Sequence, residues 1–214
     1  MKYLEAFFQG AQLMTNERKD HLIILDIVKK NSRVLDIGCA DGTLLKMLKK
    51  EKYISGQGIE IDHRKVEKCI RKGLSVVEGD ANYEIKNFPD YSFDYVILSQ
   101  TLQTVSQPKW ILNEIFRIGK NAIISFPNFG HWLCRLQLFI LGRMPVTEDL
   151  KLTWYDTQNI HLCTVKDFLQ LLEEMQLQSS QVYGITRNKK IIRYNKSFLN
   201  IFAAHVVLLV NKSN

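Results

Sequence analysis

The sequence is poor in cysteine and has no long apolar run. The four cysteines of the 214-residue chain are Cys39, Cys69, Cys134 and Cys163. None belongs to a C-x-x-C pair, so the sequence contains neither a zinc-ribbon nor a thioredoxin motif. We therefore expect reduced thiols and no metal site. The longest apolar stretches, 136–141 and 201–210, are interrupted by polar residues and fall short of the ~18 residues that a membrane-spanning helix needs.

The sequence also lacks the signals of secretion and of disorder. Residues 1–20 have no sustained apolar core and carry Glu5 early, so we expect no signal peptide and a cytoplasmic location. Hydrophobic residues make up 46% of the chain and charged residues 24%, which is ordinary for a globular protein. The length favours one domain over residues 1–214, with enough chain to bury a core.

An excess of positive charge is the one unusual feature of the composition. Lysine and arginine number 29 against 22 acidic residues, which gives +7. The acid-free basic cluster near the C-terminus comprises Arg187, Lys189, Lys190, Arg193 and Lys196. Such a balance suits nucleic acid or anionic substrates, but it also describes a solvated lysine-rich surface. Since no nucleic-acid module is spelled, we favour the surface interpretation and do not expect nucleic acid as a partner.

Short apolar runs alternate with helical patterns through the first 130 residues. The predicted strands are 33–37, 54–61, 74–78, 93–98 and 121–126. The predicted helices are 18–30, 42–51, 63–72 and 109–118. Five strands that alternate with helices indicate a parallel sheet covered on both faces, with right-handed crossovers.

The last third of the sequence has a different pattern. An apolar helix is expected over 130–142 and an irregular segment over 143–163. A second helix is expected over 164–176, where Thr164 and Asp167 form a variant of the capping box. Strands over 180–186 and 201–210 then predict an antiparallel hairpin at the sheet edge. The fold class is therefore α/β, a doubly wound and mostly parallel sheet of seven strands with an antiparallel C-terminal hairpin.

A glycine loop carries the strongest chemical signal. The run VLDIGCADGT over 34–43 follows a predicted strand and opens a helix, where glycines let the backbone approach a ligand closely. Glu60 stands 22 residues after Gly38, at the end of the next strand, a spacing that suits an acid bound to ribose hydroxyls. Asp80 follows the third strand. Ligands bind in open α/β sheets at such neighbouring carboxyl ends.

The loop has the pattern D-x-G-x-A-x-G, without the G-x-G-x-x-G of nicotinamide dehydrogenases. It resembles motif I of the class I S-adenosylmethionine (SAM)-dependent methyltransferases. The resemblance implies a Rossmann-like fold, SAM as cofactor and S-adenosylhomocysteine as product. It implies that the loop wraps the methionine part, that Glu60 holds the ribose and that Asp80 holds the adenine amino group. The implied cofactor-binding residues are Asp36, Gly38, Cys39, Ala40, Asp41, Gly42, Glu60, Ile61, Gly79, Asp80, Ala81, Ser99 and Gln100.

Ala40 departs from the motif, because most relatives carry glycine there. Its Cβ costs little where φ is negative and ~1 kcal/mol or more where φ is positive. The Cβ could also crowd the cofactor. Ala40 could therefore lower the affinity for the cofactor. The alternative is a methyltransferase fold whose pocket is inactive.

Several longer runs resemble the MetW family of methionine-biosynthesis proteins over roughly residues 20–190. They are FDYVILSQTLQ (93–103), SFPNFGHW (125–132), RLQL (135–138), GRMPVT (142–147) and WYDTQNIHLCT (154–164). The resemblance implies the methyltransferase fold and association with a homoserine O-acyltransferase. It implies no methyl acceptor, because none is established for the family.

Two functions follow from this resemblance. The first is a SAM-dependent methyltransferase of methionine biosynthesis with an unidentified small-molecule acceptor. The second is a non-catalytic subunit that activates or stabilises the acyltransferase, with a pocket that senses SAM or is vestigial. The sequence contains no motif for a general base on the acceptor side, and this favours the non-catalytic subunit.

The catalytic candidates are His161, His131 and Tyr155. A histidine with a pKa near 6.5 suits a general base at neutral pH, but each histidine could equally anchor its loop by hydrogen bonds. Tyr155 could line an acceptor pocket, although packing of Trp154 and Tyr155 over the sheet is the favoured expectation. Gln100 and its neighbour Thr101 follow the fourth strand, where this fold commonly places cofactor or acceptor contacts.

The predicted helix over 130–142 has an apolar stripe. The stripe comprises Trp132, Leu133, Leu136, Phe139 and Ile140. We expect it to face the core, with a partner-binding helix as the alternative. Binding to a membrane surface fits less well, because only Arg135 and Arg143 flank the stripe.

Overall fold

A computed structural model describes residues 18–147, 150, 152–193 and 195–212. The prediction that residues 1–20 are not a signal peptide falls mostly outside these residues. Within the described part, no helix is long and apolar enough to cross a membrane.

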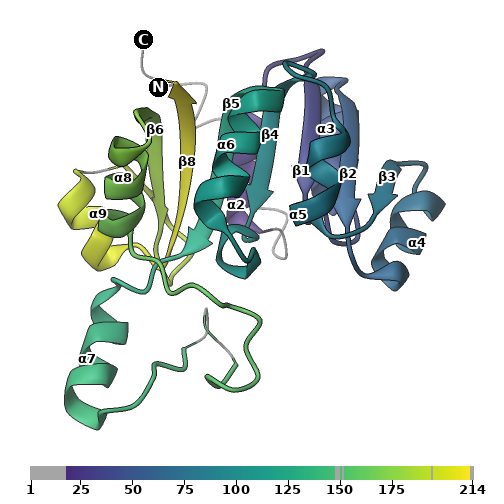
Figure 1. Ribbon diagram of the computed structural model, residues 1–214. Helices are drawn as coiled ribbons and strands as arrows, with labels where there is room; N and C mark the ends of the chain where they lie inside the picture. The colour runs from purple at the N-terminus through teal and green to yellow at the C-terminus, as the bar shows by residue number, and fades with distance from the viewer. Residues whose placement is uncertain (1–17, 148–149, 151, 194, 213–214) are drawn as a thin grey trace.

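The described residues form one mixed sheet of eight strands in the order β3-β2-β1-β4-β5-β8-β6-β7 (Figure 1). The strands are β1 (Arg33–Ile37), β2 (Ser55–Glu60), β3 (Ser75–Glu78), β4 (Phe93–Ser99), β5 (Gly119–Pro127), β6 (Leu177–Ile185), β7 (Ile191–Ile192) and β8 (His205–Lys212). The first five pair in parallel, whereas β8 runs antiparallel to both β5 and β6. The predicted parallel sheet and antiparallel C-terminal part are confirmed.

The helices cover both faces of this sheet. They are α2 (Lys19–Ile27), α3 (Thr43–Lys52), α4 (His63–Arg71), α5 (Ala81–Glu84), α6 (Pro108–Ile118), α7 (Trp132–Leu141), α8 (Val165–Glu174) and α9 (Lys196–Phe202), with 3₁₀ turns η1 (Ile85–Asn87) and η2 (Leu102–Thr104). Buried side chains of α2, α3 and α4 form one hydrophobic core, and those of α6, α8 and α9 form another on the opposite face. Both cores extend over β1 and β4, which lie in the middle of the sheet.

Helix α8 begins as its sequence predicts. The Thr164 hydroxyl accepts a hydrogen bond from the Asp167 backbone N–H, and the Asp167 carboxylate accepts one from the Thr164 backbone N–H in return. This reciprocal capping box satisfies two backbone donors that the helix leaves free. One face of α8 then buries Val165, Phe168 and Leu172 against the sheet.

Two details of the C-terminal prediction are wrong. The sheet has eight strands rather than seven, because the two-residue β7 pairs with β6 inside the basic connection. The predicted strand over 201–210 begins at His205, since residues 196–202 form α9. An apolar run alone does not distinguish helix from strand. Asn195 favours the helix, because its side chain accepts a hydrogen bond from the Phe198 backbone N–H and caps α9.

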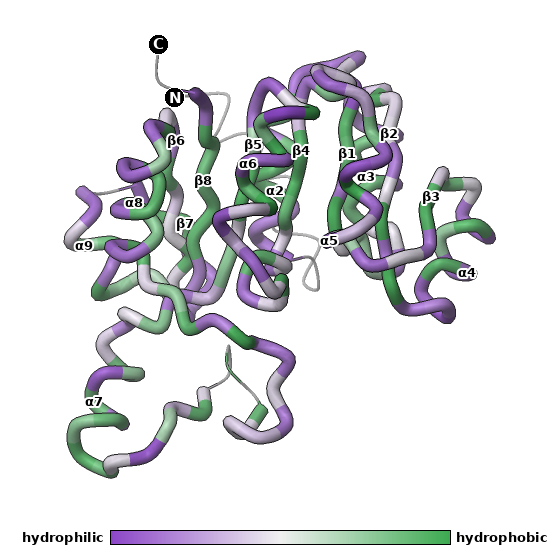
Figure 2. The backbone as a smooth tube through the Cα atoms, viewed as in Figure 1, coloured by the Kyte–Doolittle hydropathy of each residue, from purple (hydrophilic) through white to green (hydrophobic). Residues whose placement is uncertain are grey.

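The expectation that α7 faces the core is also wrong. Helix α7 lies beyond the carboxyl end of β5, where no sheet surface stands behind it (Figure 1). Cys134 is the one α7 residue that is buried, whereas Phe139 is 89% exposed. We call α7 and the described residues of 142–163 the arm. Figure 2 shows apolar segments along this arm, separated from the apolar strands of the sheet.

Candidate functional site

The glycine loop over 38–42 connects the end of β1 to α3 and alternates between backbone conformations. Gly38, Ala40 and Gly42 have φ angles of +71°, +50° and +73°. A Cβ on Gly38 would lie 2.6 Å from the Thr101 Oγ1, so glycine is required there by space as well as by φ. Ala40 therefore occupies the conformation in which its Cβ is costly.

A cavity of about 310 Å³ opens between this loop, α2 and the end of β4. Its lining residues are Arg18, His21, Asp36, Gly38, Cys39, Ala40, Asp41, Thr43, Leu44, Met47 and Ser99. We call it the first cavity. Six of the predicted cofactor-binding residues line it: Asp36, Gly38, Cys39, Ala40, Asp41 and Ser99. The sequence did not predict the other five lining residues, and the role of each predicted residue remains a prediction.

Asp36 is the most unusual group in the first cavity. It is 2% exposed, and its Oδ1 has no hydrogen-bond partner. Burial is the largest influence on this carboxyl and raises its pKa from 3.8 to about 7, although the Arg18 charge acts in the opposite direction. A buried polar atom without a partner costs free energy. Asp36 therefore offers a fixed acceptor, close to its own protonation midpoint, to a ligand that brings a donor or a positive charge.

The N-terminal end of α2 contributes charges that the sequence analysis did not include. The Arg18 guanidinium pairs with the buried Asp20 carboxylate and donates to the Ser99 Oγ at 3.0 Å, and the Ser99 hydroxyl donates to Asp20 at 3.1 Å. Burial opposes ionisation of Asp20, but its bonds to Arg18 and Ser99 outweigh burial and lower its pKa. Burial lowers the pKa of His21 to about 4, so its ring is neutral at pH 7. No local sequence pattern marks this contribution, because the burial of Asp20 is set by the fold.

Asp41 anchors the outer side of the glycine loop. The Lys72 ammonium donates to both the Asp41 backbone carbonyl and its carboxylate, at 2.7 Å each. Desolvation opposes ionisation of Asp41, yet the bonds from Lys72 and Thr43 lower its pKa to about 2. This link from α4 holds the loop in place and compensates the Asp41 charge.

Glu60 reaches the same loop from β2. Its Oε2 accepts from the Ala40 backbone N–H at 2.8 Å, and its Oε1 accepts from the Asp62 backbone N–H at 3.0 Å. The side chain is buried, yet each carboxylate oxygen can accept a further hydrogen bond. Glu60 therefore braces the strained loop residue, and it stands beside the first cavity without lining it.

The other predicted cofactor residues lie around this cavity. The Gly79 backbone N–H donates to the Glu60 carbonyl, which places the residues after β3 beside the end of β2. The Asp80 Oδ1 caps α5 by accepting from the Asn82 backbone N–H at 2.8 Å. The predicted residues that lie outside the first-cavity lining are Gly42, Glu60, Ile61, Gly79, Asp80, Ala81 and Gln100.

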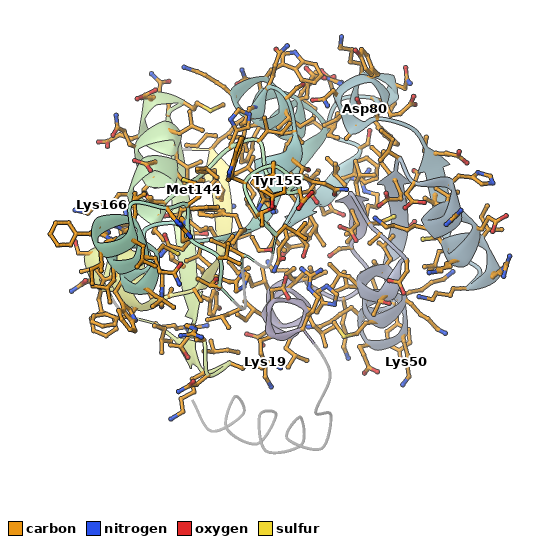
Figure 3. All side chains as sticks on the ribbon, turned by 90° about the horizontal axis from the view of Figure 1, so that it is seen from below. Lys19, Lys50, Asp80, Met144, Tyr155 and Lys166 are labelled. Carbon is orange, nitrogen blue, oxygen red and sulfur yellow. The ribbon has the colours of Figure 1, made fainter. Side chains whose placement is uncertain are left out.

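A second cavity, of about 550 Å³, lies between the end of β4 and the arm. Its described lining residues are Gln100, Gln103, Thr104, Pro127, Phe129, Met144, Pro145, Leu150, Leu152, Trp154, Thr157, Gln158, Asn159, Ile160 and Leu162. Seen from below in Figure 3, Met144 and Tyr155 lie across the carboxyl ends of the parallel strands. Gln100, expected among the cofactor contacts, lines this second cavity instead.

The three catalytic candidates are not brought together. His131 is 4% exposed and caps α7, where its Nδ1 accepts from the Leu133 backbone N–H. Tyr155 is 68% exposed and lines neither cavity. The expected packing of Trp154 and Tyr155 over the sheet is wrong, since both rings are exposed and contact each other edge to face. His161 donates its backbone N–H to the Gln103 carbonyl beside the second cavity.

Among the described residues, no group of three or more His, Cys, Asp or Glu side chains could hold a metal ion.

The sequence pattern of the family "Methionine biosynthesis protein MetW" matches residues 18–210. The chain belongs to the MetW family. This assignment links it to methionine biosynthesis and confirms the resemblance carried by the runs between β4 and α8.

One relative of this MetW chain is a bifunctional methionine biosynthesis protein MetXA/MetW from Rhodopirellula baltica, 34% identical over 165 residues. The match covers 73% of this chain and 26% of the relative, so the chain spans about a quarter of that protein's length. In the relative, MetXA and MetW parts share one polypeptide.

Solved structures show the fold of this MetW chain. A SAM-dependent methyltransferase from Thermotoga maritima matches with a TM-score of 0.67 and 18% identity over 99% of this chain and 97% of its own. A second SAM-dependent methyltransferase, from Archaeoglobus fulgidus, matches with a TM-score of 0.65 and 18% identity over 97% and 99%. At this identity the likeness shows the class I methyltransferase fold alone.

Proposed function

We propose that this MetW chain binds SAM in the first cavity and acts in methionine biosynthesis as a methyltransferase with an unidentified acceptor. The observation that carries the proposal is Asp36, a buried carboxylate whose free Oδ1 stands beside the left-handed glycine loop. SAM carries an ammonium, a carboxylate and a sulfonium. A cavity with an acid at its base and a guanidinium on its lining fits such a ligand in charge.

Each residue has a role that its surroundings allow. Asp36 accepts from the ligand ammonium, and Arg18 pairs with the ligand carboxylate. The loop can present its backbone to the ligand because Gly38 and Gly42 adopt positive φ angles that glycine allows without steric cost. Glu60 keeps lone pairs free for ribose hydroxyls while it holds the Ala40 N–H. Asp80 accepts from the adenine amino group.

When bound, SAM supplies a methyl group activated by the sulfonium. The chain's contribution is to orient the two reactants and to exclude water. Proximity and orientation account for much of the rate in such displacements, so no general base is obligatory. This agrees with the separation of His131, Tyr155 and His161 from the first cavity.

Calorimetric titration with SAM and S-adenosylhomocysteine tests the proposal. We expect micromolar binding to the wild-type chain and a loss of about 100-fold or more in Glu60→Ala, which removes both the ribose contact and the loop brace. Glu60→Gln keeps an acceptor for the Ala40 N–H and should retain intermediate affinity. The exposed Glu67→Gln is the matched control. No binding to the wild-type chain at millimolar SAM, or unchanged binding in Glu60→Ala, contradicts the proposal.

A second function is supported by the arm and by the fused relative. In the Rhodopirellula protein the MetXA and MetW parts are covalently joined, which favours association between this chain and a homoserine O-acyltransferase. The α7 side chains present an apolar surface, with Phe139 89% and Ile140 63% exposed. Large exposed apolar patches mark sites of interaction. The partner-binding alternative for this helix therefore replaces the core-facing one, and the chain would activate or stabilise the acyltransferase through α7.

Mixing the purified chain with the acyltransferase of the same organism tests this second function. We expect a complex on gel filtration, a change in acyltransferase rate, and loss of both in Phe139→Asp. Ile70→Asp on α4, where Ile70 is 61% exposed, is the control with the same change of charge and polarity. Absence of a complex at micromolar concentrations, or equal effects of the two variants, contradicts it.

A further inference from the structure

The second cavity adjoins the first at consecutive residues of the chain. Ser99, the last residue of β4, lines the first cavity, and Gln100 lines the second. A volume of about 550 Å³ lies within the range of small-molecule sites. The two cavities therefore approach each other at the end of β4, and transfer of a group would require that ligands in them meet there.

The described lining of the second cavity contains no charged side chain. Its polar members are the amides Gln100, Gln103, Gln158 and Asn159 and the hydroxyls Thr104 and Thr157. The remaining side chains are apolar, among them Phe129, Leu152 and Trp154. Because an unpaired charge is costly to remove from water, this lining disfavours ions. A free amino acid would find no charged partner for its ammonium or its carboxylate among the described lining residues.

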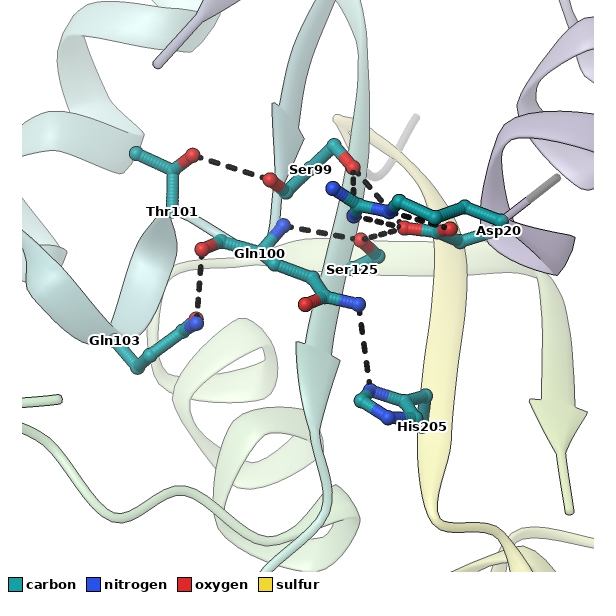
Figure 4. Close-up of polar contacts among 8 residues, drawn as sticks. Asp20, Ser99, Gln100, Thr101, Gln103, Ser125 and His205 are labelled. Atoms are coloured by element: carbon teal, nitrogen blue, oxygen red, sulfur yellow. Dashed lines mark hydrogen bonds and ion pairs between the residues drawn. The ribbon is translucent and has the colours of Figure 1, made fainter. Parts of the chain in front are cut away.

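Gln103 contributes an acceptor that no group of the described chain uses. Its side chain is 6% exposed, and its Nε2 donates to the Gln100 carbonyl at 2.8 Å (Figure 4). That bond fixes the orientation of the amide, and Oε1 is left buried with no partner. Leaving such an atom unpaired costs free energy, which a ligand donor would recover.

The wall that carries Gln103 is held rigidly. Gln100 has a φ of +55°. Its backbone N–H donates to the Ser125 hydroxyl at 3.1 Å (Figure 4), and also to the Ser125 carbonyl at 2.9 Å. From the arm, the backbone N–H groups of Ile160 and His161 donate to the Gln103 carbonyl at 2.8 and 3.1 Å. Strained backbone that its surroundings hold in place gathers at functional sites. His161 Nε2, also buried without a partner, lies on the segment fixed in this way.

We propose that the second cavity is the acceptor site, and that it takes an uncharged, largely apolar small molecule whose hydroxyl or amide N–H donates to Gln103 Oε1. This inference rests on the proposed methyl transfer, for which it names the substrate class. Gln103 selects the ligand by its acceptor oxygen, and the described part of the wall, which carries no charge, disfavours ions such as free amino acids.

Four probes of similar shape test the charge and donor requirements. They are benzyl alcohol, toluene, benzylamine (a cation at neutral pH) and benzoate. Their dissociation constants are measured by ligand-observed NMR with the full chain, without SAM. We expect benzyl alcohol to bind about tenfold more tightly than either ion and several-fold more tightly than toluene. Equal or tighter binding of either ion overturns the inference.

Substitution of Gln103 locates the preference. Gln103→Met removes the acceptor at similar volume and should reduce benzyl alcohol to the affinity of toluene. Gln178→Met, at an exposed position of β6, should change nothing. Gln103→Glu restores an acceptor and adds a negative charge, so at pH 8 it should favour benzylamine over benzyl alcohol. Circular dichroism confirms that each variant is folded. Unchanged selectivity in both Gln103 variants overturns the inference.

The two proposals fail separately because the probe measurement needs no SAM. Selectivity for benzyl alcohol without SAM binding to the wild-type chain would overturn the proposed methyl transfer and, with it, the acceptor role of the cavity. SAM binding without probe selectivity would overturn the acceptor class alone.

Discussion

The two cavities at the end of β4 differ in the charge of their walls and in how the chain builds them. The first has Arg18, Asp36 and Asp41 on its lining, whereas the described lining of the second has amides, hydroxyls and apolar side chains. Eight of the eleven residues that line the first cavity lie within 36–47, around one loop with three left-handed residues, and the N-terminal end of α2 and the end of β4 supply the other three. The described lining of the second cavity comes from the ends of β4 and β5 and from the arm, between residues 100 and 162. Most of the site for a charged ligand thus comes from a local motif, whereas the site for a neutral ligand has no such local centre.

Removing the charge of Asp36 should have the largest effect on this contrast. The folded chain holds the Asp36 proton up to a pH of about 7, and the unfolded chain releases it near 3.8. This carboxyl therefore contributes stability below pH 4 that is lost as the pH rises to 7, a loss of up to about 4 kcal/mol. Asp36→Asn has no such loss. We expect urea unfolding to show the variant more stable than wild type at pH 8, with the difference shrinking towards pH 5.

The affinity for SAM should rise with pH over the range in which the stability contribution of Asp36 falls. An ammonium pairs with the ionised form of Asp36, so wild-type affinity should rise between pH 6 and pH 8, and Asp36→Asn should bind more weakly without this rise. Asp90→Asn, which changes an exposed carboxylate, is the control. Parallel stability curves for Asp36→Asn and wild type from pH 5 to 8 would contradict the raised pKa.

The glycine loop should also tolerate substitution unequally. Gly38→Ala places a Cβ at positive φ and 2.6 Å from Thr101, and Thr101 is too short a side chain to move aside cheaply. Gly73→Ala meets the same φ, +70°, with nothing within 4 Å. We expect the free energy of unfolding to fall by about 3 kcal/mol for Gly38→Ala and by about 1 kcal/mol for Gly73→Ala. Equal losses would mean that backbone conformation alone, and not space, requires glycine at position 38.

Much of the first cavity could be predicted because its signals are local. A strand, a glycine turn and a helix lie within ten residues, and the spacing to Glu60 follows from one βαβ unit. The contribution of α2 was missed, because Arg18 and Asp20 stand at the start of a helix whose apolar face dominates its pattern. Contact between α2 and the end of β4 spans about 80 residues, and no local pattern encodes it.

Hydrophobic periodicity could not predict the position of the arm or the second cavity, for a different reason. The sequence of α7 has the same apolar stripe whether the helix covers a sheet or projects from it. The exposure of Phe139 depends on where the chain leaves β5, which is a property of the tertiary fold. Gln103 likewise reads as an ordinary polar residue after a strand. Its side-chain oxygen is left as a free acceptor because its amide nitrogen donates to the Gln100 carbonyl.

The smallest effect should come from the one departure from the loop motif. Ala40 has a φ of +50°, so its Cβ costs about 1 kcal/mol, and Ala40→Gly removes that cost while giving the unfolded chain more freedom. We expect the free energy of unfolding to change by less than about 1 kcal/mol. SAM affinity should stay within about threefold of wild type, because the Ala40 N–H that Glu60 holds is unchanged. A tenfold gain in affinity would show instead that the alanine methyl crowds the ligand. Gln100→Gly relieves the same strain in the wall of the second cavity, but it also removes a side chain that contacts His205, so it should be less stable than Ala40→Gly.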